Sequence, residues 1–118
     1  MIDLKPAMLN ALSALPACTA AAFAREETPL PVITVSQEGG EVTARADGEA
    51  YLEEYTMAVD VYAAAPEEAE ALAIRADAAL SALGLRRADT RDEYDEGAYA
   101  WRKTLRYRAV IHGDTLYQ

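Results

Sequence analysis

The fold is decided by residues 51–62, YLEEYTMAVDVY, in which apolar and polar side chains alternate along the chain. A period of two is typical of a β-strand with one buried face, since successive side chains point to opposite sides of a sheet. We therefore predict a long strand over this stretch. One of its faces carries Tyr51, Glu53, Tyr55, Met57, Val59 and Val61, and the other carries Leu52, Glu54, Thr56, Ala58, Asp60 and Tyr62.

A helix is predicted directly after this strand, beginning at Pro66. Proline suits the first helical position, and Glu67 and Glu68 place negative charge where the helix dipole favours it. Gly84 stands where a helix ends with a left-handed residue. The apolar face is mostly alanine, so the helix can pack close to a sheet; it comprises Ala69, Leu72, Ala73, Ala76, Leu80 and Leu83.

Hydrophobic spacing and proline positions predict the other elements. A first helix is expected over 3–15, with Asp3 as its N-cap and Pro16 as its stop. Further strands are expected over 18–26, 32–37, 85–91 and 98–111.

Two connections are predicted between these strands. Residues 38–49 contain Gly39-Gly40 and Asp47-Gly48, which indicate a protruding loop or a flexible hairpin. Residues 92–97 form an acidic turn between the last two strands.

These elements indicate one α+β domain over residues 1–118. The expected order is α-β-β-β-α-β-β, with a mostly antiparallel sheet of four or five strands and two helices on one face. The other face of the sheet is then left open.

Charge is distributed unevenly along the chain, whose net charge is −9. Residues 1–84 hold 4 basic and 14 acidic side chains, whereas residues 85–118 hold 7 basic and 6 acidic side chains. Because binding to a nucleic-acid backbone requires Lys and Arg, we expect no sequence-specific nucleic-acid binding. No apolar run is long enough for a membrane span, and the first residues lack the pattern of a secretory signal, so we expect a cytoplasmic place of synthesis and no membrane partner.

We find no catalytic, metal or cofactor pattern in the residues. Cys18 and His112 are the single cysteine and histidine, and the acids of residues 89–96 do not have the spacing of a calcium loop. We expect no enzyme activity, no metal and no cofactor.

The last predicted strand is the most informative, because Arg102, Arg106 and Arg108 share one of its faces. These arginines can form cross-strand ion pairs with Glu54 and Asp60, or they can receive acidic groups of another subunit. Both interpretations stay open. The candidate subunit-interface residues are Arg102, Arg106, Arg108, Glu54, Asp60, Glu38, Glu41, Arg45 and Asp47.

The order of several stretches resembles the small tail-completion, or tail-terminator, proteins of long-tailed bacteriophages, prophages and gene transfer agents. The stretches are Met1–Leu9, Pro31–Gln37, Tyr55–Tyr62, Pro66–Glu70, Leu83–Arg87 and Arg106–Arg108.

The resemblance implies a structural virion protein of the tail-neck region, assembled in the host cytoplasm. Its expected form is a ring of six copies that caps the tail tube and joins it to the head-completion or stopper protein of the connector. DNA would pass through the lumen. Two alternatives stay open: another neck component, such as a head-completion or stopper protein, and a small acidic protein-binding module or inhibitor.

Overall fold

A computed structural model describes residues 2–15, 19–21, 29–46, 48–113 and 115–117. Two helices and six strands follow one another in this part of the chain, which confirms the predicted α+β class. A short last strand was not predicted. The elements are α1 (Lys5–Leu12), β1 (Thr19–Ala21), β2 (Val32–Ala46), β3 (Glu49–Ala63), α2 (Pro66–Ala82), β4 (Arg86–Asp95), β5 (Ala100–His112) and β6 (Thr115–Tyr117).

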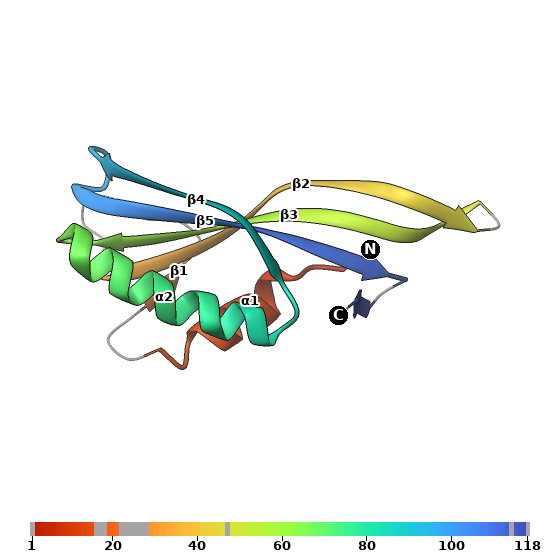
Figure 1. Ribbon diagram of the computed structural model, residues 1–118, viewed down its shortest axis with the longest axis horizontal. Coiled ribbons are helices and arrows are strands. Elements are labelled where there is room, and N and C mark those ends of the chain that lie inside the picture. The colour runs from red at the N-terminus through yellow and green to blue at the C-terminus, as the bar shows by residue number, and fades with distance from the viewer. Residues whose placement is uncertain (1, 16–18, 22–28, 47, 114, 118) are drawn as a thin grey trace.

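The strands form one sheet in the order β1-β2-β3-β5-β4, with β6 paired to the end of β5. Five strands pair antiparallel, whereas β1 pairs parallel with β2. Both helices lie on the same side of the sheet (Figure 1). This arrangement confirms the prediction of a mostly antiparallel sheet that is covered on one face.

The core lies between the helices and the sheet face predicted from the alternation in β3. Met8 and Leu12 from α1 and Leu72 and Leu80 from α2 are buried there. They meet Ile33 and Val35 of β2, Tyr55, Met57, Val59 and Val61 of β3, and Leu105, Tyr107, Ala109 and Ile111 of β5. The period-two pattern therefore predicted the buried side of the central strands.

Helix α2 begins at Pro66 as predicted, and its alanine-rich face is buried. Small side chains let the helix axis approach the sheet closely, because little volume separates the two backbones. The φ angle of Gly84 is +97°, the left-handed conformation expected after a helix. Residues 66–84 thus fold as the sequence predicts.

Helix α1 is shorter than the predicted 3–15, since it begins at Lys5 and ends at Leu12. The prediction of Asp3 as the N-cap is wrong, because Leu4 occupies that position. Asp3 lies one residue earlier, and its Oδ1 accepts a hydrogen bond from the Lys5 backbone N–H at 3.0 Å. The Ile2 N–H donates to the Tyr55 hydroxyl at 3.0 Å, which ties this segment to β3. Of the predicted strand 18–26, Thr19–Ala21 forms β1; Cys18 and residues 22–26 lie outside the described residues.

The prediction of a loop over 38–49 is wrong, and the hairpin alternative is correct. Strands β2 and β3 pair from Val32 opposite Tyr62 to Ala46 opposite Glu49. Gly39 and Gly40 are strand residues next to a register shift, where an added residue bends the strand. We call the distal part of this hairpin, residues 38–54, the arm; it extends beyond the helices and gives the molecule its 50 Å length (Figure 1).

The predicted acidic turn 92–97 is also displaced. Strand β4 continues to Asp95 and β5 begins at Ala100, so the turn consists of residues 96–99. Asp92, Glu93 and Asp95 are therefore strand residues opposite β5. Pairing with β5 supplies backbone hydrogen bonds that outweigh the poor strand propensity of these acids.

Gly40 and Gly39 provide a matched test of the packing in the arm. A Cβ at Gly40 would lie 3.1 Å from the Tyr55 ring, which is buried and hydrogen-bonded, whereas a Cβ at Gly39 would meet nothing within 4 Å. We expect Gly40→Ala to lower the free energy of unfolding by about 1 kcal/mol through overpacking. Gly39→Ala should leave it unchanged or raise it by about 0.5 kcal/mol. Urea denaturation measures the free energy of unfolding of both variants. An equal change in this free energy for Gly40→Ala and Gly39→Ala would contradict the close approach of Tyr55.

Candidate subunit interface

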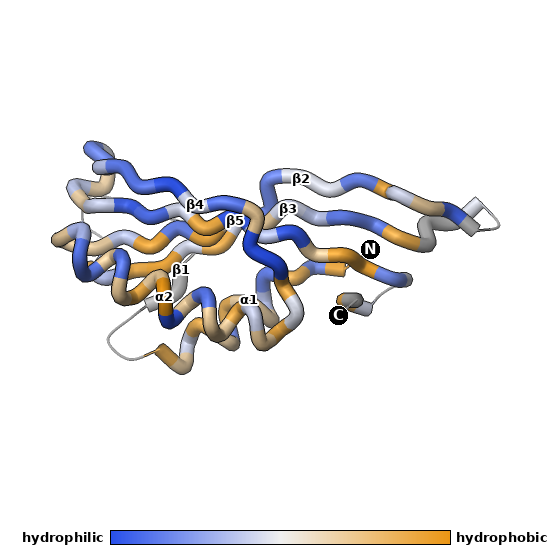
Figure 2. The backbone as a smooth tube through the Cα atoms, in the orientation of Figure 1, coloured by the Kyte–Doolittle hydropathy of each residue, from blue (hydrophilic) through white to orange (hydrophobic). Residues whose placement is uncertain are grey.

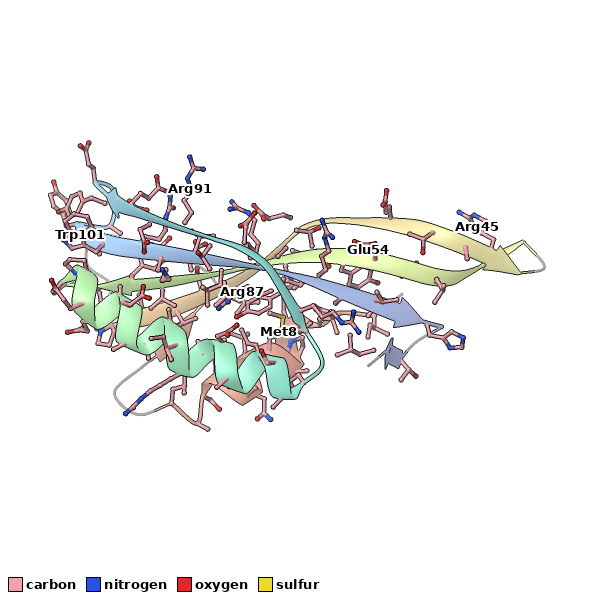
Figure 3. The ribbon with its side chains drawn as sticks, viewed as in Figure 1. Met8, Arg45, Glu54, Arg87, Arg91 and Trp101 are labelled. Atoms are coloured by element: carbon pink, nitrogen blue, oxygen red, sulfur yellow. The ribbon has the colours of Figure 1, made fainter. Side chains whose placement is uncertain are left out.

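The sheet face opposite the helices is ionic, and no helix of the described chain covers it. The even-numbered residues of β3 and β5 point to this face, together with charged residues of β2 and β4. Strand β4 is almost continuously hydrophilic (Figure 2), and Arg91 projects from it away from the helices (Figure 3). Thr34, Ala58 and Thr104 are nevertheless buried, because long charged side chains lie over them.

Arg102 is bound to β4 rather than to β3. Its guanidinium forms ion pairs with Glu93 and with Asp95, the latter at 3.2 Å. The predicted pairing of this arginine with Glu54 or Asp60 is therefore wrong. The neighbouring Tyr62 has its pKa raised by burial, while its hydrogen bond with Arg102 opposes that rise.

Arg106 connects three strands of the open face. Its Nε lies 2.7 Å from Oε1 of Glu38 on β2, and its other end lies 3.6 Å from Asp89 on β4. Because β3 lies between β2 and β5, this contact reaches across the intervening strand. Arg106 and Glu38 are thus brought together as a structural pair.

Arg108 confirms one predicted cross-strand pair. Its Nε lies 3.5 Å from Oε1 of Glu54, but 67% of the arginine side chain remains exposed. Asp60 instead accepts a hydrogen bond from the Thr104 hydroxyl. Of the three arginines, Arg108 is the least engaged by its own chain.

The remaining predicted residues lie on the arm. Glu41 is exposed and stands directly opposite Glu54. Arg45 lies near the end of the arm, far from Trp101 (Figure 3), and its guanidinium donates to the Gly48 carbonyl at 3.5 Å. Asp47 lies outside the described residues.

Sequence reasoning missed the acids of β4 as arginine partners. Asp89, Glu93 and Asp95 were assigned to the end of a strand and an acidic turn, whereas their pairing with β5 places them beside Arg102 and Arg106. Extending both strands toward the glycine at residue 97 would have indicated this pairing. Arg86 was missed as well; it stands opposite Arg108 and lines a hollow of about 380 Å³.

A second polar network lies on the helix side of the sheet. The buried Tyr107 hydroxyl donates to Asp77 Oδ1 of α2 at 2.7 Å, and Asp77 Oδ2 accepts from Arg87 at 3.1 Å. Burial raises the pKa of Tyr107 far above its usual value, and the hydrogen bond to Asp77 raises it further. This network joins α2 to both β5 and β4.

Aromatic side chains gather at the end of the molecule opposite the arm. Trp101 is 38% exposed and packs edge-to-face on Tyr94, with ring centroids 5.3 Å apart. Tyr99 in the adjoining turn is 62% exposed and has a positive φ of 51°.

The described residues contain no group of three His, Cys, Asp or Glu side chains placed to hold a metal ion. Within the same part of the chain, neither helix combines the length and the apolar character needed to cross a membrane. The described polar chemistry of the open face consists of ion pairs and hydrogen bonds, and a small apolar cluster of Val32, Tyr62, Ala98 and Ala100 lies at one end of it.

The fold and its ionic face define a small α+β domain whose uncovered sheet is the candidate surface for contacts with other proteins. The family model described as Tail completion protein gp17 matches residues 6–112. The chain therefore belongs to this family of bacteriophage tail-completion proteins, which are structural tail proteins rather than enzymes, and membership implies a virion component. None of the curated proteins matches the sequence.

Arg106 and Arg108 should differ in their contribution to the fold. We expect Arg106→Gln to lower the free energy of unfolding by up to about 1 kcal/mol, because it leaves Glu38 and Asp89 without their shared cation. Arg108→Gln should change it by less than about 0.5 kcal/mol. Thermal and urea unfolding of the two variants measure these free energies. A larger loss of unfolding free energy for Arg108→Gln than for Arg106→Gln would contradict the stronger structural role assigned to Arg106.

The Tyr107–Asp77 hydrogen bond predicts a pH dependence. Replacing Tyr107 by Phe should cost about 1–2 kcal/mol of unfolding free energy at neutral pH. Since the folded pKa lies above the unfolded value of about 10, this stabilisation is complete below pH 10 and is lost as pH rises above it. The difference between wild type and Tyr107→Phe should therefore shrink between about pH 10 and 11.5. A difference that stays constant over this range would contradict the raised pKa.

Proposed function

We propose that the protein forms a closed ring, of six copies, that caps the phage tail tube and joins it to the head–tail connector. Membership of the tail-completion family carries this proposal. The family supplies the structural role in the tail, and the surface of this chain supplies the reason for a ring.

A ring is supported by the two different edges of the sheet. Beyond Thr34 the outer edge of β2 pairs with no strand among the described residues, and β4 forms the opposite edge. A contact between two different edges is heterologous, and such contacts close into rings when the rotation between copies is a fraction of a full turn. Register shifts in β2 and the dense charge of β4 disfavour indiscriminate strand pairing at these edges.

The partners that we assign are the tail tube protein on one side of the ring and the head-completion or stopper protein on the other. The chain's net charge of −9 supports a lumen through which DNA passes without lasting contact, because like charges repel. The exposed Tyr94, Tyr99 and Trp101 support a protein contact at the end opposite the arm, since Tyr and Trp are enriched at interfaces.

The test is the solution mass over a concentration series, with and without tail tubes, followed by negative-stain imaging. We expect a species of about 77 kDa, six times the 12.8 kDa chain, that images as a ring and binds the end of a tube. A protein that stays monomeric at all concentrations and ignores tail tubes would sink the proposal. Binding to the portal complex but not to tubes would instead favour another neck component.

A further inference from the structure

Two pairs of like charges stand directly opposite each other on the open face. Glu41 of β2 is the register partner of Glu54 of β3, and Arg86 of β4 is the register partner of Arg108 of β5. Like charges at directly opposed positions destabilise a sheet. The ion pair between Arg108 and Glu54 offsets part of this repulsion, but no ion pair of the described residues compensates Glu41 or Arg86.

The four residues lie on the open face as two neighbouring pairs, and we call them the charge stripe: Glu41, Glu54, Arg108 and Arg86. The two pairs are offset by two residues along the strands, since Glu54 stands opposite Val110 and Arg108 stands opposite Thr56. The inner two are in contact, since Arg108 Nε lies 3.5 Å from Glu54. The outer two, Glu41 and Arg86, have no ionic partner among the described residues. They cannot meet within one chain, because three strand spacings of about 4.8 Å, roughly 14 Å in all, separate β2 from β4.

Each outer residue borders a hollow. Glu41 and Glu54 flank one of about 210 Å³ that is also lined by Gly39, Gly40 and Thr56. Arg86, Arg87 and Arg108 border the hollow of about 380 Å³ together with Glu54, and its other walls are small or apolar residues, Gly84, Ala88 and Val110. A Cβ at Gly39 would meet nothing within 4 Å, and its φ is not positive, so neither crowding nor backbone conformation inside the chain requires glycine there. Glycine inside a strand weakens it and often marks a close approach by another backbone.

The stripe is acidic at one edge of the sheet and basic at the other. Two copies placed side by side in the same orientation bring the β2 edge of one to the β4 edge of the next. When the second copy is shifted by about two residues along the strands, Glu41 of the first copy faces Arg86 of the second, and each outer charge gains an opposite charge. A stagger of this kind closes into a ring when the strands tilt relative to the ring axis. The same contact repeats from copy to copy, as a ring requires.

We propose that the charge stripe is the self-association contact of this protein, in which the Glu41 hollow on the arm of one copy receives Arg86 of a second copy. The occupant is a second copy rather than another protein, because both complementary halves are present on one chain at opposite edges of the same face. This inference rests on the proposed ring, for which it names the contact.

Two charge reversals test the contact, Glu41→Arg and Arg86→Glu. Each variant alone places like charges at every contact, so each should need at least about tenfold more protein for half-assembly. An equimolar mixture should recover the wild-type value, because copies that alternate around the ring pair Arg at 41 with Glu at 86 and Glu at 41 with Arg at 86. Assembly is measured by sedimentation, with tail tubes present if wild type requires them.

Glu68→Arg and Arg75→Glu form a matched control, because both positions are exposed on α2, away from the open face. Their single variants should assemble like wild type. Recovery in the Glu41→Arg and Arg86→Glu mixture also shows that both variants are folded.

Two results would overturn the contact while leaving the ring intact: single variants that assemble like wild type, or impaired variants whose mixture does not recover. Failure of wild type to self-associate under any condition would instead overturn the proposed ring, and this contact with it.

Discussion

The antiparallel pairing of β3 with β5 is the constraint on which the rest of the structure depends. It runs without a register shift from Leu52 opposite His112 to Ala63 opposite Trp101. Because a shift by one residue would exchange the two faces of a strand, this unbroken register fixes which side chains enter the core. Tyr55, Met57 and Tyr107 consequently face the helices, while Glu54, Asp60 and the three arginines of β5 face away from them.

The two faces contribute to the protein in different ways. The helix side buries a continuous apolar cluster, and burial of such surface is the dominant stabilising term in folding. The open side holds ion pairs that are mostly partly exposed, and each contributes about 0–1 kcal/mol. Its charges are therefore poorly explained by stability alone, which is why an acidic pair and a basic pair at opposite edges support a role in recognition.

The arm depends on the same sheet but receives less support from it. Near the base of the arm, β3 is flanked by β2 and β5. On its helix-facing side, Tyr55 is hydrogen-bonded to Ile2 in the segment before α1. Toward its end, β2 and β3 pair only with each other among the described residues, and Gln37 through Thr43 are exposed. Two-stranded hairpins are marginally stable alone, so assembly with further copies would add the contacts that the arm lacks.

The sequence alone determined the α+β class, the buried face of the long strand, helix α2 with its end at Gly84, and the presence of a row of arginines. These features are local, since side-chain period, proline and glycine act within one element. The family resemblance was likewise carried by the order of such elements and is confirmed by the family model.

Only the tertiary structure decided the partners of those arginines and the shape of the arm. Arg102 and Arg106 bind acids of β4, which the sequence had placed at the end of a strand and in a turn, and Gly39-Gly40 continues a strand instead of ending one. Strand register and strand length are set by pairing with residues far along the chain, so neither can be determined from a local pattern. For the same reason the opposition of Glu41 to Glu54 and of Arg86 to Arg108 is set by the strand pairing and by no local pattern of the sequence.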